Sequence, residues 1–158
     1  MKRFYQAAAA VPLGGGRHGI TLDGRAVRTP ARAELWVPSR SLAAAMAAEW
    51  AAQGDQIDVA TMPMNGLANA AIDRVTPDQE RFAAALAAYA DSDLTAYRAE
   101  GPAPLVERQQ AVWTPIISWA KARYGVDVQV IAGIVHQPQP STTLARLARV
   151  VGSMSAFH

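Results

Sequence analysis

The first forty residues carry the alternating pattern of short antiparallel strands. Residues 19–22 and 25–29 flank the pair Asp23-Gly24, which suits a two-residue type I′ turn because both turn residues take positive φ. Polar and apolar side chains alternate again over residues 34–37, between two prolines that cannot donate to a central ladder. We therefore predict a hairpin, a third short strand, and an edge strand over residues 3–7.

From Ser39 onward the apolar spacing changes to that of a helix. Leu42, Met46 and Trp50 fall on one stripe, because residues three or four apart share a helical face. Ser39 can accept a backbone N–H as the N-cap, and Gly54 suits the left-handed position that often follows a helix. The sequence thus predicts a helix bounded by Ser39 and Gly54.

Two further helices are predicted in the next stretch. One covers residues 65–73. The other begins at a capping box formed by Thr76 and Gln79, with Pro77 at the first helical position, where its missing N–H costs nothing.

The last sixty-five residues predict a short strand, a long helix, another strand and a final helix. The short strands are expected at 94–98 and 126–130, the long helix is expected to end at Gly125, and Ser141 is expected to cap the last helix. The apolar stripe of the long helix comprises Leu105, Val112, Trp113, Ile116, Ile117, Ala120 and Tyr124.

This order of elements predicts an α+β fold, with a small antiparallel strand-rich N-terminal lobe followed by a mainly helical lobe. We expect a strand-rich domain with one or two helices over residues 1–75 and a helical domain over residues 76–158. A chain of 158 residues is long enough for such lobes to share a core without covalent staples.

Composition excludes several classes of protein. The chain has no cysteine, so disulfides and thiolate metal sites are impossible, and the composition fits a reducing compartment. No apolar run approaches the ~18 residues that a membrane span requires. We expect no membrane insertion.

Charge is segregated along the chain. Residues 1–48 hold seven basic and two acidic side chains, residues 49–100 hold three and nine, and residues 101–158 hold five and two. The basic footprint is therefore local, and arginines that alternate along strands usually line the solvated face of a sheet. We do not expect nucleic-acid binding.

Catalytic and cofactor motifs are missing or out of context. Residues 14–19 match G-x-G-x-x-G, but the dinucleotide motif opens a helix, whereas here a strand follows, so we interpret the segment as a turn between strands. The three histidines, His18, His136 and His158, lack the spacing that places two metal ligands on one helical face. We expect a protein without cofactor, metal or turnover.

One enzymatic alternative stays open. Active sites assemble in space, so Asp91, Asp93 and His136 could form the site of a small-molecule enzyme. A deep pocket that joins these side chains would favour the enzyme, and a broad apolar surface would favour a binding protein.

The tryptophans are candidate anchors, because large aromatic side chains serve either cores or interfaces. Trp50 and Trp113 lie on apolar stripes and are expected in the core. Trp119 lies off the main stripe of its helix and suits either an exposed contact or packing under a missing segment. Glu49 and Arg98 each stand near an aromatic residue and could form an ion pair. The candidate partner-binding residues are Trp50, Glu49, Asp93, Arg98, Trp113 and Trp119.

An ordered series of short motifs resembles one family, the assembly chaperone of the F-type ATP synthase that attends the alpha subunit of the F1 head. The matching segments, in chain order, are Lys2-Arg3-Phe4-Tyr5, Leu22-Asp23-Gly24-Arg25, Thr29-Pro30, Val37-Pro38-Ser39, Glu49-Trp50, Gln53-Gly54, Thr61-Met62-Pro63, Asn69, Asp73, Asp93-Leu94, Tyr97-Arg98, Leu105-Val106, Gln109, Trp113, Pro115, Trp119 and Arg123-Tyr124-Gly125. Their common order and spacing make the resemblance specific.

The resemblance implies a chaperone that holds the unassembled alpha subunit until beta subunits arrive. A subunit destined for a ring exposes a large apolar face, and transient capping prevents wrong pairings. We expect a monomer that is cytoplasmic in bacteria, or in the mitochondrial matrix of a eukaryote. Family members continue through further helices that include an acidic partner-binding position, so the helical domain is expected to be incomplete at its C-terminus.

Overall fold

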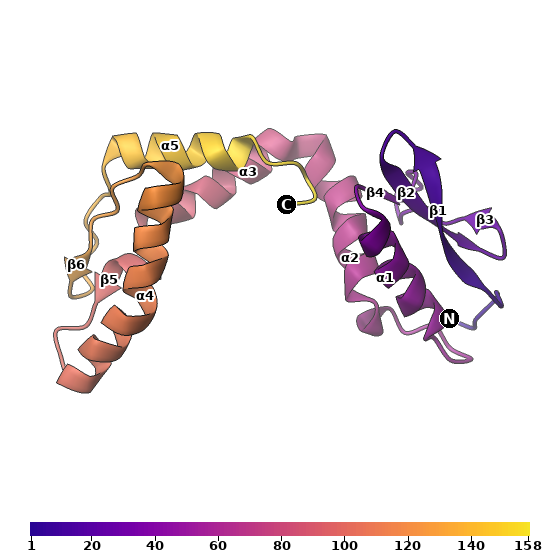
Figure 1. Cartoon of the computed structure of the whole chain (residues 1–158), viewed down its shortest axis with the longest axis horizontal. Coiled ribbons are helices and arrows are strands. Elements are labelled where there is room, and N and C mark those ends of the chain that lie inside the picture. The colour runs from indigo at the N-terminus through magenta and orange to yellow at the C-terminus, as the bar shows by residue number, and fades with distance from the viewer. The chain divides into compact units, whose positions relative to one another are not determined.

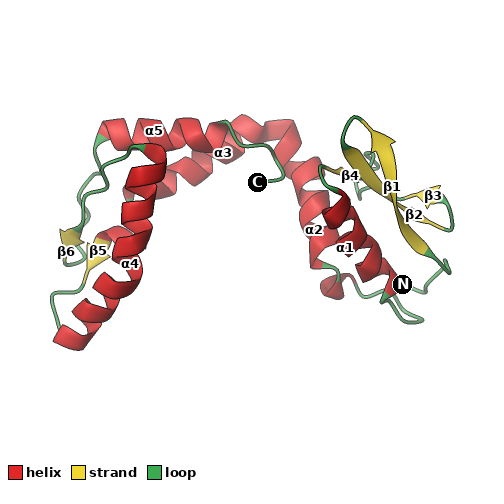
Figure 2. Ribbon diagram, viewed as in Figure 1, coloured by secondary structure: helices red, strands yellow, loops and turns green.

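The computed structural model describes all 158 residues, and its fold is α+β, as predicted (Figure 1). Two compact units form: one contains Met1–Asp78 together with Ser155–His158, and the other contains Gln79–Met154. Figure 2 shows the strands of the first unit as a sheet, with the helices of the same unit beside it. The strand-rich domain expected at 1–75 and the helical domain expected at 76–158 remain a prediction.

The sheet of the first unit is antiparallel and centred on β2 (Arg17–Leu22), which pairs with β1 (Ala8–Gly14), β3 (Arg25–Ala26) and β4 (Trp36–Val37). The predicted type I′ hairpin is confirmed, since Asp23 and Gly24 have φ of 48° and 79°. The glycine run is the turn between β1 and β2, as predicted.

The edge strand predicted at residues 3–7 is wrong, because β1 begins only at Ala8. The Asp23 carboxylate instead accepts the backbone N–H groups of Gln6 and Ala7 at 2.8–3.1 Å. These two hydrogen bonds hold the pKa of Asp23 below its usual range. The N–H groups that an edge strand would direct to a neighbouring strand therefore bind the Asp23 side chain instead.

Helix α1 (Arg40–Ala51) packs on the sheet and supplies the centre of the core. Ser39 is its N-cap, as predicted, and accepts the N–H of Leu42 at 3.2 Å. Ile20, Val37 and Met46 are fully buried where the helix meets the strands. Burying such a side chain contributes roughly 1.5–3 kcal/mol.

The predicted end of this helix at Gly54 is wrong, since Gly54 does not have a positive φ. The buried side chain of Gln53 organises the exit instead. Its Nε2 donates to the Glu49 carbonyl and to Thr61 Oγ1, both at 3.0 Å, and its Oε1 accepts the N–H of Asp58 at 2.8 Å. A glycine in the left-handed conformation is not needed.

Helix α2 (Pro63–Ala70) is followed by a π-helical turn (Ala71–Val75), a 3-10 turn (Thr76–Asp78) and α3 (Gln79–Ala88). The capping box predicted at Thr76 is wrong, because Thr76 has helical φ and ψ and its hydroxyl donates to the Ala71 carbonyl at 2.8 Å. A residue that continues helical structure cannot serve as an N-cap.

The second unit contains α3, α4 (Ala103–Tyr124) and α5 (Ser141–Gly152), with α3 and α5 side by side in Figure 1. Gly125 ends α4 with a φ of 63°, as predicted. A two-residue parallel pair joins β5 (Tyr97–Arg98) to β6 (Ile131–Ala132). No helix is both long and apolar enough to cross a membrane.

Three predictions in this unit are wrong. The strand expected at 94–98 is confined to residues 97–98, because Leu94–Ala96 forms a 3-10 turn. Residues 126–130 form no strand, because side chains bind their backbone: Gln139 bonds to both the N–H and the carbonyl of Gln129, at 2.8 and 2.9 Å. The N-cap of α5 is Pro140, which offers no capping side chain, and Ser141 is the first helical residue.

Candidate partner-binding site

Trp50 joins the two clusters of the N-terminal core. Its indole Nε1–H donates to Asn65 Oδ1 at 2.9 Å, and its carbonyl accepts the Tyr5 hydroxyl at 2.7 Å. The rings of Tyr5 and Trp50 meet edge to face, 5.6 Å apart, and burial raises the pKa of Tyr5. Trp50 is half-buried and packs against both clusters, so it serves the architecture and also reaches the surface.

Glu49 caps α2 from outside the helix. Its carboxylate accepts the N–H groups of Met64 and Asn65 at 2.8 and 3.0 Å, and the Nδ2 of Asn65 at 2.7 Å. These backbone groups are among the four unpaired donors at a helix start, and the α2 N-cap residue, Met62, supplies no side-chain acceptor. Glu49 therefore holds α2 against α1.

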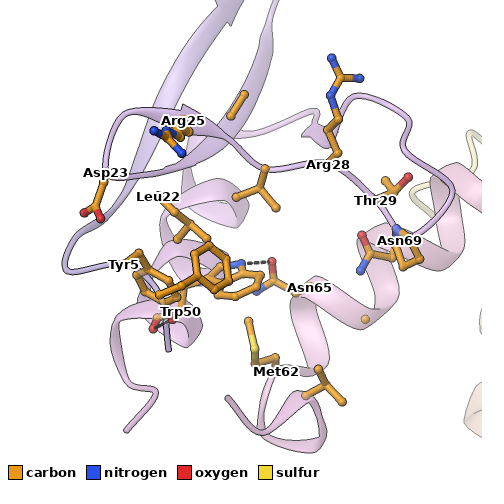
Figure 3. Close-up of a pocket in the computed structure, with 16 residues that line it drawn as sticks. Tyr5, Leu22, Asp23, Arg25, Arg28, Thr29, Trp50, Met62, Asn65 and Asn69 are labelled. Carbon is orange, nitrogen blue, oxygen red and sulfur yellow. Dashed lines mark hydrogen bonds between the residues drawn. The ribbon is translucent and has the colours of Figure 1, made fainter. Parts of the chain in front are cut away.

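A cavity of about 720 Å³ opens beside this network. Figure 3 shows Tyr5, Trp50 and Met62 along its lower side, Asn65 and Asn69 on α2, and the chain from Leu22 to Thr29 across the top. Arg25, Arg28 and Asp23 also line it, so an apolar interior meets a charged border with two basic groups and one acidic group.

Arg98 is buried in the second unit, where it binds its neighbours and not Glu49. Its guanidinium donates to the Thr95 carbonyl and lies over the Trp113 ring, 5.3 Å from the centroid. Burial lowers the pKa of Arg98. Trp113 is half-buried, so the pair is a structural cation–π contact.

Asp93 has a local role. Its carboxylate accepts the N–H of Thr95 at 2.8 Å and the Thr95 hydroxyl at 2.5 Å, which caps the 3-10 turn Leu94–Ala96. This turn leads directly into β5 and the buried Arg98.

The residues of the enzymatic alternative come together only in part. His136 Nε2 lies 3.4 Å from Asp91 Oδ2, and His136 Nδ1 lies 3.0 Å from the Tyr97 hydroxyl. The His136 side chain is 52% exposed, and neither Asp91 nor His136 lines the cavity beside Trp50 or a smaller hollow lined by α3 and α5. Asp93 binds Thr95 instead, and no group of three potential metal ligands is present. This geometry does not favour catalysis.

Helix α4 exposes part of the apolar stripe that the sequence pattern predicted, together with Trp119. Leu105, Val112, Ile116 and Trp119 share one helical face at spacings of seven, four and three, and are 43–56% exposed. Trp119 is exposed, as predicted, and packs edge to face with Tyr124 at 5.4 Å. No residue of α4 is fully buried. The helix therefore has two apolar stripes, and the rest of its unit covers only one of them.

The sequence profile of the ATP12 chaperone protein family matches residues 2–121. The chain belongs to this family. The match includes the cavity, the Glu49–Trp50 network and nearly all of α4, so all the candidate residues lie within the part that defines an ATP12 chaperone protein.

Solved structures agree with this assignment. Two structures of Atp12 from Paracoccus denitrificans, one of them a mutant, are 35% identical to this chain with TM-scores of 0.92 and 0.91, and cover 99% of it. A candidate chaperone from Agrobacterium tumefaciens is 33% identical, with a TM-score of 0.89 and the same coverage. The chain spans 66% of the length of the Paracoccus proteins and 59% of the Agrobacterium protein.

Sequence reasoning missed Asn65, which is 4% exposed and joins Trp50, Glu49 and the Met46 carbonyl. The available signal was an asparagine near the start of a helix whose neighbours are mostly apolar. Such a residue either faces solvent or is buried with all its hydrogen bonds made, and the sequence does not distinguish the two.

Proposed function

We propose that this chain is a chaperone for assembly of the F1 sector of the proton-transporting ATP synthase, and that it holds the unassembled alpha subunit. Membership of the ATP12 chaperone protein family carries the proposal. An unassembled ring subunit exposes an apolar face, and a chaperone that covers it suppresses aggregation.

The exposed stripe of α4 supports this function as a docking surface. Four large apolar side chains on one helical face cost free energy in water and suit an apolar client surface. Trp119 is the proposed contact residue among the six candidates. Trp50, Glu49, Asp93, Arg98 and Trp113 are proposed to position the elements on which the contacts lie.

The finer proposals follow from the same function. The protein acts as a monomer, without cofactor or turnover, in the bacterial cytoplasm or the mitochondrial matrix, where the alpha subunit is made or delivered. Neither nucleic acid nor a membrane takes part.

The direct test is binding to the alpha subunit from the same organism. We expect the chain to copurify with that subunit and to reduce its light scattering on dilution from denaturant. Replacing an exposed interface tryptophan by alanine commonly costs more than about 2 kcal/mol, or roughly thirtyfold in Kd. Trp119→Ala is therefore expected to weaken binding, while Trp119→Phe retains most of it.

Two outcomes would contradict these proposals. A chain that neither binds the alpha subunit nor reduces its aggregation has another function. If the chain binds and Trp119→Ala binds equally well, the client docks elsewhere.

A further inference from the structure

The cavity of the N-terminal unit has an interior whose polar groups are largely paired. The indole N–H of Trp50 is bound to Asn65, and the Tyr5 hydroxyl is bound to the Trp50 carbonyl. The aromatic rings of Tyr5 and Trp50 therefore present apolar surface to the cavity. Leu22, Val27 and Met62 extend this apolar surface. Its volume of about 720 Å³ lies in the range of about 300–1,000 Å³ typical of ligand pockets.

One polar atom in the wall lacks a partner. Asn69 Oδ1 is buried and accepts no hydrogen bond, whereas buried polar atoms in proteins are nearly always paired. Figure 3 shows the Asn69 side chain extending from α2 on the side of the cavity nearest Thr29. The atom has almost no accessible surface, so an occupant of the cavity does not reach it in this geometry.

The border of the cavity is basic. Arg25 and Arg28 line it together with Asp23, whose carboxylate accepts two backbone N–H groups and keeps its charge, so the two arginines exceed the one acid. Arg28 uses Nη1 for the Arg32 carbonyl, which leaves its other guanidinium donors for an acceptor outside the chain. A carboxylate is the complement of such a border.

The border also coincides with the edge of the sheet. The order β1-β2-β3 makes β3 terminal, and both of its residues, Arg25 and Ala26, line the cavity. An edge strand can accept an extended segment as an added strand, whose alternate side chains then enter adjacent pockets. This placement favours a peptide segment over a compact small molecule.

We propose that this cavity binds an extended segment of the client in which a large apolar side chain stands next to an acidic one. The apolar side chain lies over Trp50 and Met62, and the carboxylate meets Arg25 and Arg28 at the border. The inference deepens the proposed function and rests on it. It adds a second contact that is separate from the stripe of α4.

Gly66 offers a way to block the cavity without disturbing the fold. It lies within α2, lines the cavity, and a Cβ built on it would meet no atom within 4 Å. Gly66→Phe therefore fills the cavity mouth, and replacing a helical glycine does not reduce helix propensity. Leu67→Phe is the matched control, because Leu67 is the next residue of α2, is 68% exposed and does not line the cavity.

The experiment measures the Kd for the alpha subunit by titration calorimetry, with circular dichroism to compare the fold and Tm of each variant. We expect Gly66→Phe to weaken binding at least tenfold and Leu67→Phe to leave it unchanged. Arg28→Glu is expected to weaken binding by a similar factor, more at low than at high salt, while Arg40→Glu on the exposed start of α1 has little effect.

The outcomes separate the two proposals. If the unmodified chain does not bind the alpha subunit, the proposed function itself fails. If it binds, and folded Gly66→Phe and Arg28→Glu bind as tightly, only the cavity proposal is overturned. Should Gly66→Phe not fold, Arg28→Glu against Arg40→Glu decides the question alone.

Discussion

At the scale of single residues, several candidates act through backbone groups. Glu49 satisfies two unpaired N–H donors of α2, Asp93 caps the turn before β5, and Arg98 binds a carbonyl while covering an indole. The sequence marked these side chains as unusual because each stands beside an aromatic or a turn. Their partners come from other segments or from the turn's own backbone, which a linear pattern does not reveal.

Glu49→Ala is expected to lower the free energy of unfolding by about 1–3 kcal/mol, because two helix N–H groups and the Asn65 amide lose their acceptor. Glu49→Gln keeps an oxygen acceptor and loses the charge near the helix start, so a smaller cost of about 0.3–1 kcal/mol is expected. Urea denaturation followed by circular dichroism measures both. Equal, negligible costs would show that α2 does not depend on this cap.

At the scale of elements, turns and caps that depend on local chemistry were predictable, and those that depend on distant partners were not. Asp23, Gly24 and Gly125 have positive φ, and aspartate before glycine in a turn and glycine after a helix are the residue types that favour this conformation. Gly54 looked equally suitable, but Gln53 reaches Thr61 and Asp58 and fixes the chain without it. The fold class followed from the order of elements, whereas the cavity is assembled from segments up to sixty-five residues apart.

The two glycines make this difference measurable. Gly125→Ala forces a side chain into the left-handed region and is expected to cost about 1 kcal/mol. Gly54→Ala is expected to cost close to nothing, since Gly54 has no positive φ and a Cβ there would meet no atom within 4 Å. Thermal unfolding of both variants beside the parent chain checks the pair, and a lower Tm for Gly54→Ala than for Gly125→Ala would contradict the account.

At the scale of the whole molecule, the two units differ in how much core they contain. The first buries large side chains such as Ile20, Leu35 and Met46. The buried apolar residues of the second are Ala83, Ala96, Val126 and Ile131, and α4 buries none fully. Local stability follows buried apolar contacts, so the helix proposed to meet the client belongs to the less stable unit.

Hydrogen exchange tests this contrast within one sample. Backbone amides in the middle of α1 and of β2 are expected to exchange at least about tenfold more slowly than those of α4, because opening α4 exposes little that is buried. Adding the alpha subunit is then expected to slow exchange in α4, since a docked client covers the stripe around Ile116 and Trp119. Amides of β1, which lie outside both proposed contacts, serve as the internal control. Equal protection of α1 and α4 in the free chain would show that α4 is held by more than its half-buried stripe, and unchanged exchange in α4 on binding would place the client elsewhere.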